Sequence, residues 1–226
     1  MASFLFFAAV KGFGFCGIFG KRRNTSSRFS WSLSLGVSGM EDKFRNLNFD
    51  PRSIPLRHLQ TIGLACAAYA QTEDHLQMAI AGCLGVDAEL GWAVTSHMTA
   101  PLRENVLKSV AEIKLDDLDD LDKLDELIEL VGKAAEKRNN IAHNLWCTDE
   151  RTREVFVVKT SARGSVRADM IPMPLPKLRE DADFIYEAGI ELFRFLMAKN
   201  LIPALPSADR PRFHKTKAAR KKRIKT

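Results

Sequence analysis

The sequence lacks the short motifs by which several large classes of enzyme are recognised. It contains no G-x-x-x-x-G-K loop and no G-x-S-x-G turn, which argues against phosphate-loop nucleotide hydrolysis and α/β-hydrolase chemistry. Its five histidines include no H-x-x-x-H pair and no Cys/His cluster, so we expect no bound metal and no cofactor. The four cysteines form no C-x-x-C pair, which is typical of reduced thiols in a cytoplasmic protein.

Long uninterrupted hydrophobic runs are also absent. The most apolar stretch, residues 4–20, is broken by Lys11 and by four glycines, and it is short for a membrane span. Its charged residues follow the apolar part, whereas a secretory signal carries them before it. We expect Met40 to be the natural start and residues 1–39 to be a disordered leader or spurious extension, with a targeting or anchor segment as the alternative. No membrane contact is expected for residues 40–226.

Acidic residues are missing from one end of the chain and scarce at the other. The net charge of +6 divides into +5 for residues 1–39, +8 for residues 209–226 and −7 for residues 40–208. The basicity therefore belongs to the ends, and it does not show that the central part binds nucleic acid. We divide the chain into the leader, a helical domain at 40–203 and a disordered basic tail at 204–226.

Apolar residues recur at alternating spacings of three and four along several stretches, which predicts amphipathic helices. The predicted helices cover residues 56–84, 88–98, 101–113, 121–145 and 177–199. Within the chain, residues 112–130 carry nine acids, and leucine recurs among them. We interpret this run as the solvated face of a helix. The alternative is an acidic patch that repels nucleic acid or binds the basic tail.

A β-hairpin is predicted before the last helix. Residues 154–159 alternate as a strand does, residues 161–164 supply a turn, and residues 165–171 can return as the partner strand. The expected fold class is therefore all-α, an antiparallel up-and-down four-helix bundle with a small β-hairpin inserted before the last helix.

Two charged residues, Glu73 and Arg138, occupy otherwise apolar helix stripes. A buried charge is costly unless it is paired, so each is expected to have a partner or a task. Arg138 is followed by Asn139 and, five positions on, by His143. On an unbroken helix Arg138 and His143 diverge by about 140°, whereas Asn139 and His143 share a face. Two copies facing each other across a two-fold axis can bring both motifs to one phosphate.

The segment Arg138-Asn139-Asn140-Ile141-Ala142-His143 resembles the R-polar-x-x-x-H motif of the HEPN superfamily. The wider order is similar to that of a group of uncharacterised bacterial HEPN-like proteins: an early helix with Glu73, the late motif near Trp146, strands, and a closing helix. The resemblance covers roughly residues 55–200.

This resemblance implies a dimeric helical bundle whose paired motifs line a cleft. It implies a metal-independent endoribonuclease in a defence or toxin–antitoxin role, with RNA as substrate and an antitoxin or other protein as partner. An imidazole exchanges protons near neutral pH, so His143 is the candidate general acid or base, and the Arg138 fork suits the charge on a phosphate. Asn139 would orient the imidazole, and Glu73 would hold Arg138. Other members of the superfamily are non-catalytic RNA- or protein-binding modules, which is the alternative for this chain.

Purely structural interpretations of the same residues stay open. His143 and the asparagines can cap a helix end. Arg138 and Glu73 can form an ion pair between helices, and Trp92 and Trp146 can be core residues. A third function is a helical bundle tethered to nucleic acid by residues 209–226 alone.

Overall fold

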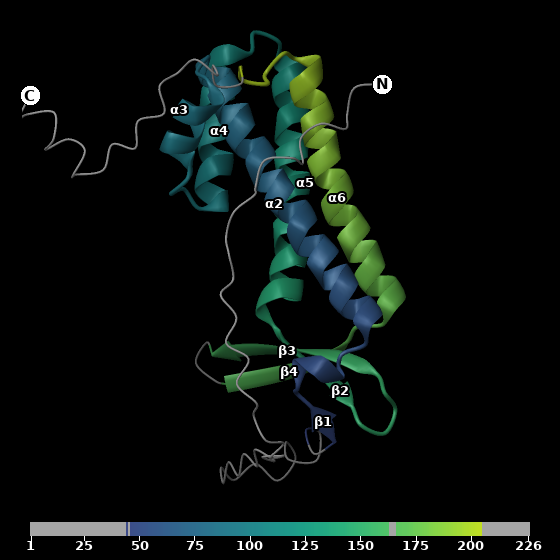
Figure 1. The fold of residues 1–226 in the computed structure, drawn as a ribbon. Helices are drawn as coiled ribbons and strands as arrows, with labels where there is room; N and C mark the ends of the chain where they lie inside the picture. The colour runs from purple at the N-terminus through teal and green to yellow at the C-terminus, as the bar shows by residue number, and fades with distance from the viewer. Residues whose placement is uncertain (1–43, 45, 163–165, 205–226) are drawn as a thin grey trace, which may run out of the picture. The chain divides into compact units, whose positions relative to one another are not determined.

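The structure, a computed structural model, describes residue 44, residues 46–162 and residues 166–204. These residues form a mostly helical fold with one small antiparallel sheet (Figure 1). The predicted leader at 1–39 and the predicted tail beyond Ala204 lie outside the described residues. The elements are β1 (Leu47–Asn48), a 3-10 turn η1 (Pro51–Ser53), α2 (Leu56–Leu84), α3 (Ala88–Thr95), α4 (Ala100–Lys114), α5 (Leu118–His143), β2 (Leu145–Asp149), β3 (Val155–Ala162), β4 (Val166–Pro172) and α6 (Leu175–Ala198).

The helix boundaries follow local signals in the sequence. α2 has the predicted length and ends at Gly85, whose φ of 66° lets its N–H reach the last carbonyls of the helix. The acidic run is divided by a break between α4 and α5. Asp117 caps α5 by accepting a hydrogen bond from the N–H of Asp119, and acidic side chains in this first turn favour the helix dipole. The other acids of α5 lie largely on its exposed face, as expected for a solvated helix surface.

The predicted lone hairpin is wrong, because β3 and β4 are half of a four-stranded antiparallel sheet in the order β1-β2-β3-β4. β2 pairs with β3, placing Trp146 opposite Val157, and the two-residue strand β1 pairs with β2. β2 was missed because a single residue, Asn144, separates it from α5, so its residues continue the predicted helix stripe. The all-α fold class is therefore corrected to a mostly helical fold with a small sheet.

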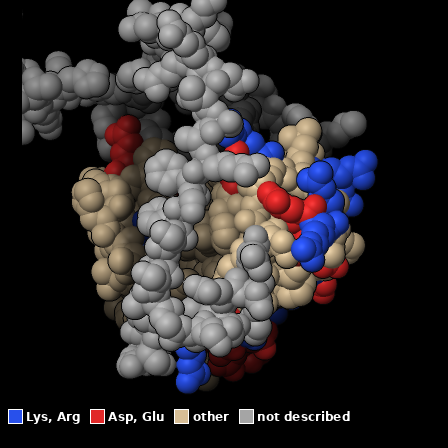
Figure 2. Space-filling view, turned by 90° about the horizontal axis from the view of Figure 1, so that it is seen from below, with Lys and Arg blue, Asp and Glu red and all other residues tan. Residues whose placement is uncertain are grey.

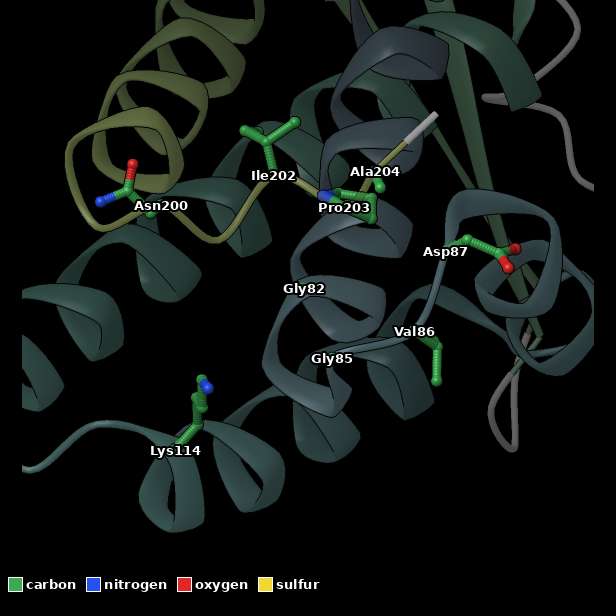
Figure 3. Close-up of a pocket in the computed structure, with 9 residues that line it drawn as sticks. All are labelled: Gly82, Gly85, Val86, Asp87, Lys114, Asn200, Ile202, Pro203 and Ala204. Atoms are coloured by element: carbon green, nitrogen blue, oxygen red, sulfur yellow. The ribbon is translucent and has the colours of Figure 1, made fainter. Parts of the chain in front are cut away.

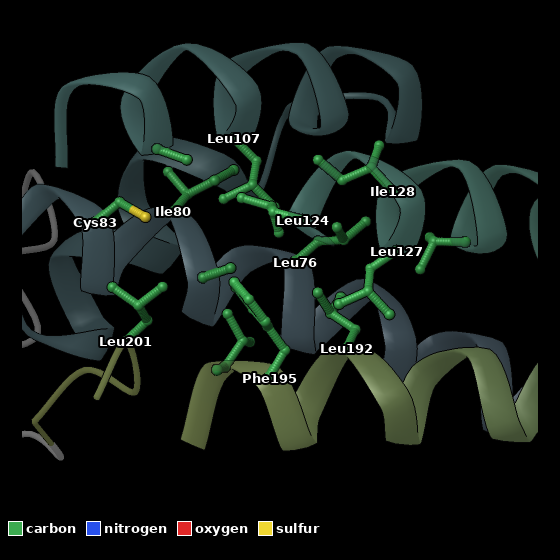
Figure 4. Packing of buried hydrophobic residues seen from close by; sticks show 14 residues of the cluster. Leu76, Ile80, Cys83, Leu107, Leu124, Leu127, Ile128, Leu192, Phe195 and Leu201 are labelled. Carbon is green, nitrogen blue, oxygen red and sulfur yellow. The ribbon is translucent and has the colours of Figure 1, made fainter. Parts of the chain in front are cut away.

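The three longest helices, α2, α5 and α6, lie alongside one another, and α4 packs against α2 and α5 (Figure 1). Two apolar cores hold them together. The first joins the C-terminal half of α2 to α4, α5 and α6, with Leu76, Ile80 and Leu192 fully buried (Figure 4). The second joins the N-terminal half of α2 to the end of α5, the start of α6 and the sheet, with Tyr69 and Ile141 inside it.

The core face of α5 matches the predicted apolar stripe only as far as Val131. The predicted members are Leu121, Leu124, Ile128, Val131, Ala135, Arg138, Ala142 and Leu145. Beyond Val131, Ala134 and Ile141 are buried, whereas Ala142 is exposed and Leu145 is a strand residue that is 55% exposed. Leu127, Ala134 and Ile141 are buried and are spaced by seven residues, so the buried face at the end of α5 follows a row one position earlier than the predicted Ala135 and Ala142.

No single helix in the described part of the chain is long and apolar enough to cross a membrane. α2 and α3 meet the length and composition test only as a pair, with a bend of 114° between them.

Candidate functional site

The motif residues lie at the C-terminal end of α5, and the structure brings Arg138, Asn139 and His143 together. Nη1 of Arg138 lies 3.2 Å from Nε2 of His143 and donates a hydrogen bond of 3.0 Å to Oδ1 of Asn139. A guanidinium carries donors only, so Nε2 of His143 is the acceptor in this pair. This hydrogen bond requires a neutral imidazole whose proton is on Nδ1. His143 and Asn139 are exposed, while Arg138 is half-buried.

The expectation that one helix directs Arg138 and His143 to different places is wrong. The divergence of about 140° describes the Cβ directions, and it neglects the reach of an arginine side chain. Helical side chains also lean toward the N-terminus, so His143 leans back toward the turn that carries Arg138. The pair consequently forms within one chain.

The buried side of Arg138 rests on Tyr69 of α2. The guanidinium carbon lies 5.1 Å from the centre of the Tyr69 ring, a cation–π contact. Tyr69 is 2% exposed, and neither its hydroxyl nor Nε of Arg138 has a hydrogen-bond partner. Burial raises the pKa of Tyr69 to about 12, and the charges of Glu73 and Glu104 add to the increase, so the phenol stays neutral.

Glu73 does not pair with Arg138 as expected; its ion pair is with Arg103 of α4. Oε1 of Glu73 lies 3.3 Å from Nη1 of Arg103, and Nε of Arg103 donates to the carbonyl of Thr95 at 3.3 Å. Arg103 is 7% exposed, so it needs these partners. Sequence reasoning missed Arg103, because the apolar pattern of α4 gives no sign that this residue points inward.

Other residues cap the end of α5. The indole N–H of Trp146 donates to the carbonyl of Ile141 at 2.8 Å, and Nδ2 of Asn144 donates to the carbonyl of Asn140 at 2.9 Å. His143 makes neither of these contacts, so its side chain remains available beside Arg138. Trp146 is half-buried and packs against the second core, as a structural residue would.

The charges around the sheet end of the molecule are mixed. Lys137, the residue before Arg138, forms an ion pair with Asp181. Its Nζ lies 5.2 Å from the centre of the Phe184 ring. Figure 2 shows basic and acidic side chains next to each other on the described part of this face.

A pocket of about 320 Å³ lies elsewhere, at the C-terminal end of α2. Its lining includes Gly82, Gly85, Lys114, Asn200 and residues 202–204 (Figure 3). Arg138 contacts Tyr69, thirteen residues before Gly82 on α2, so this pocket is separate from the motif. Among the described residues, no group of histidine, cysteine or carboxylate side chains has the arrangement of a metal site.

No protein-family model, curated protein or solved structure matches the chain. The arrangement of Arg138, Asn139, His143 and Tyr69 is therefore the basis of the functional argument.

Proposed function

We propose that the chain is a metal-independent endoribonuclease of the HEPN type, a helical bundle that acts as a cytoplasmic homodimer in a defence or toxin-like role. The observation that carries the proposal is the 3.2 Å approach of Arg138 to His143 at an exposed helix end. This approach puts a cation that can bind a phosphate beside a group that can exchange a proton.

The chemistry requires no metal. The 2′-hydroxyl of RNA attacks the adjacent phosphorus, the bond to the 5′-oxygen breaks, and a 2′,3′-cyclic phosphate and a 5′-hydroxyl result. His143 takes the proton of the attacking hydroxyl or gives one to the leaving oxygen, and water makes the other of these two transfers. Arg138 stabilises the charge that develops on the phosphate, and Asn139 fixes the guanidinium by accepting from Nη1.

The surface beside the site supports the dimer. Leu59, Ile62 and Cys66 precede Tyr69 on the same stripe of α2, yet Leu59 is 39% exposed and the other two are only half-buried. No described element covers them fully, and residues 59–72 carry no Lys, Arg, Asp or Glu that would repel a second copy. A two-fold contact along this stripe would bury it and place two Arg138–His143 pairs in one groove.

The test is cleavage of RNA by the full chain in excess EDTA, at a concentration where sedimentation shows a dimer. Activity that survives EDTA, is lost in His143→Ala and is kept in His97→Ala supports the proposal. His97 is a matched control because it is also exposed but lies between α3 and α4. Absence of cleavage by the dimer on single-stranded and structured RNA contradicts it.

The alternative is a non-catalytic HEPN-like module that binds RNA or protein. The charge of −7 on residues 40–208 and the mixed charges of Figure 2 favour it, since a nuclease surface attracts RNA best when it is basic. In that case His143→Ala and Arg138→Ala alter binding or dimerisation, and no variant or wild-type protein shows turnover.

A further inference from the structure

We propose that Tyr69 is a positioning residue of this site, which holds the Arg138 side chain through the face of its ring so that Nη1 meets His143. The catalytic consequence rests on the proposed function. The positioning itself concerns the free protein and can be measured without RNA.

Arg138 has different contacts on its solvent side and on its buried side. On the solvent side Nη1 meets Asn139 and His143, and on the buried side Nε has no hydrogen-bond partner. The ring of Tyr69 is the contact found on that buried side. An arginine side chain has many rotamers, and a fixed aromatic face removes most of them.

The ring is itself well fixed. Tyr69 is 2% exposed and lies in the second core, with Ala65, Ala68, Ala134 and Ile141. Its hydroxyl makes no hydrogen bond, so the ring face and not the hydroxyl carries the contact. A neutral phenol presents the electron-rich face that attracts a cation.

Arg103 protects this arrangement. Glu73 lies one helical turn after Tyr69, so both side chains are on the same face of α2. Besides burial, the carboxylates of Glu73 and Glu104 raise the pKa of Tyr69, and the guanidinium groups of Arg138 and Arg103 oppose this effect. An unpaired Glu73 would compete with His143 for the Arg138 guanidinium, and Arg103 occupies that carboxylate at 3.3 Å.

The experiment measures the tautomer of His143 in the full chain by long-range proton–nitrogen NMR of nitrogen-15 histidine at pH 8, assigned with His143→Ala. In the wild type we expect the Nδ1–H form, because Nε2 accepts from Arg138. Tyr69→Leu removes the ring, releases Nε2 and gives a mixture of the two tautomers. Tyr69→Phe retains the ring and restores the Nδ1–H form.

A buried-core control separates positioning from general loosening. Leu192→Ala truncates a fully buried residue of the other core, which does not include Tyr69, and should leave the tautomer unchanged. A wild-type tautomer in Tyr69→Leu, an equal change in Tyr69→Phe, or a similar change in Leu192→Ala would each overturn the proposal.

The rate of RNA cleavage provides a second, separate test of the proposal. If the wild type cleaves RNA, Tyr69→Leu should lower kcat on the order of 10- to 100-fold with little change in KM, since misplacement of a catalytic group has effects of this size. An unchanged kcat overturns the catalytic part of the proposal. If the tautomer changes as expected but the wild type cleaves no RNA, the proposed function fails and the positioning role of Tyr69 stands.

Discussion

Nη1 of Arg138 lies 3.2 Å from Nε2 of His143 within a single chain, although five positions separate the two residues on α5. A second copy of the chain is therefore not needed to bring an arginine next to a histidine. In the proposed dimer each subunit would bring a complete pair, so the two-fold axis would double the site and would not have to create it.

Mixing two inactive variants tests this arrangement. A heterodimer of Arg138→Ala and His143→Ala subunits contains no chain with both residues. Because the pair forms within one chain, we expect the mixture to be as inactive as either variant alone in an RNA-cleavage assay. Recovery of a substantial part of the wild-type rate after subunit exchange would show that the arginine and the histidine act across the interface.

Arg103→Gln tests the protective role of Arg103. The substitution frees Glu73, and we expect Glu73 to draw Arg138 away from His143, which changes the His143 tautomer toward a mixture in NMR spectra. Adding Glu73→Gln removes the competing carboxylate and should restore the wild-type tautomer. If the double variant behaves like Arg103→Gln alone, competition by Glu73 is not the cause.

The packing of α2 against α6 has a position that tolerates no side chain. A Cβ added at Gly189 would collide with the hydroxyl of Thr72. We expect Gly189→Ala to lower the free energy of unfolding by about 1–3 kcal/mol, as overpacking of a core does. Thr72→Ala should recover part of this loss, giving a favourable coupling in a double-mutant cycle measured by urea unfolding. Additive effects would mean that the helices separate without strain.

Stability should fall in mild acid because of two buried histidines. Burial lowers the pKa of His58 and the pKa of His75. Nε2 of His58 contacts the carbonyl oxygen of Met173, and Nδ1 of His75 contacts the carbonyl oxygen of Gly189. The unfolded chain takes up protons on these residues near pH 6.5 and the folded chain does so only at lower pH, so stability is present above pH 6.5 and is lost as the pH falls below it.

Urea midpoints between pH 8 and pH 5.5 measure this loss. His75→Gln should make the dependence on pH shallower, because the titrating imidazole is gone. His97→Gln, which alters an exposed histidine, should leave it unchanged. An equal slope in His75→Gln and wild type would assign the acid sensitivity to other groups.

Trp146→Phe should loosen the end of α5. The variant keeps an aromatic ring but loses the hydrogen bond to the carbonyl of Ile141, which we expect to cost about 1 kcal/mol of unfolding free energy. Amide hydrogen exchange should rise first at residues 141–144, next to His143. Unchanged exchange there would show that the pairing of β2 alone holds the helix end.

The long helices could be predicted because their buried faces repeat every three or four residues, and α2 ends at Gly85. β1 and β2 could not, because two to five residues give too short a pattern and pair with partners distant in the chain. Arg138 was found as a charge on an apolar stripe, whereas its contact with Tyr69 depends on the packing of α5 against α2. Arg103 was missed for the same reason, since its partners come from other segments of the chain.

The most direct measurement of the central claim is the identity of the RNA ends after incubation of the dimeric full chain in EDTA. The account predicts 5′-hydroxyl and 2′,3′-cyclic phosphate ends that form with the wild type and not with His143→Ala. Intact RNA with the wild-type dimer, or the same ends at the same rate with His143→Ala, would contradict the assignment of Arg138 and His143 as a ribonuclease site.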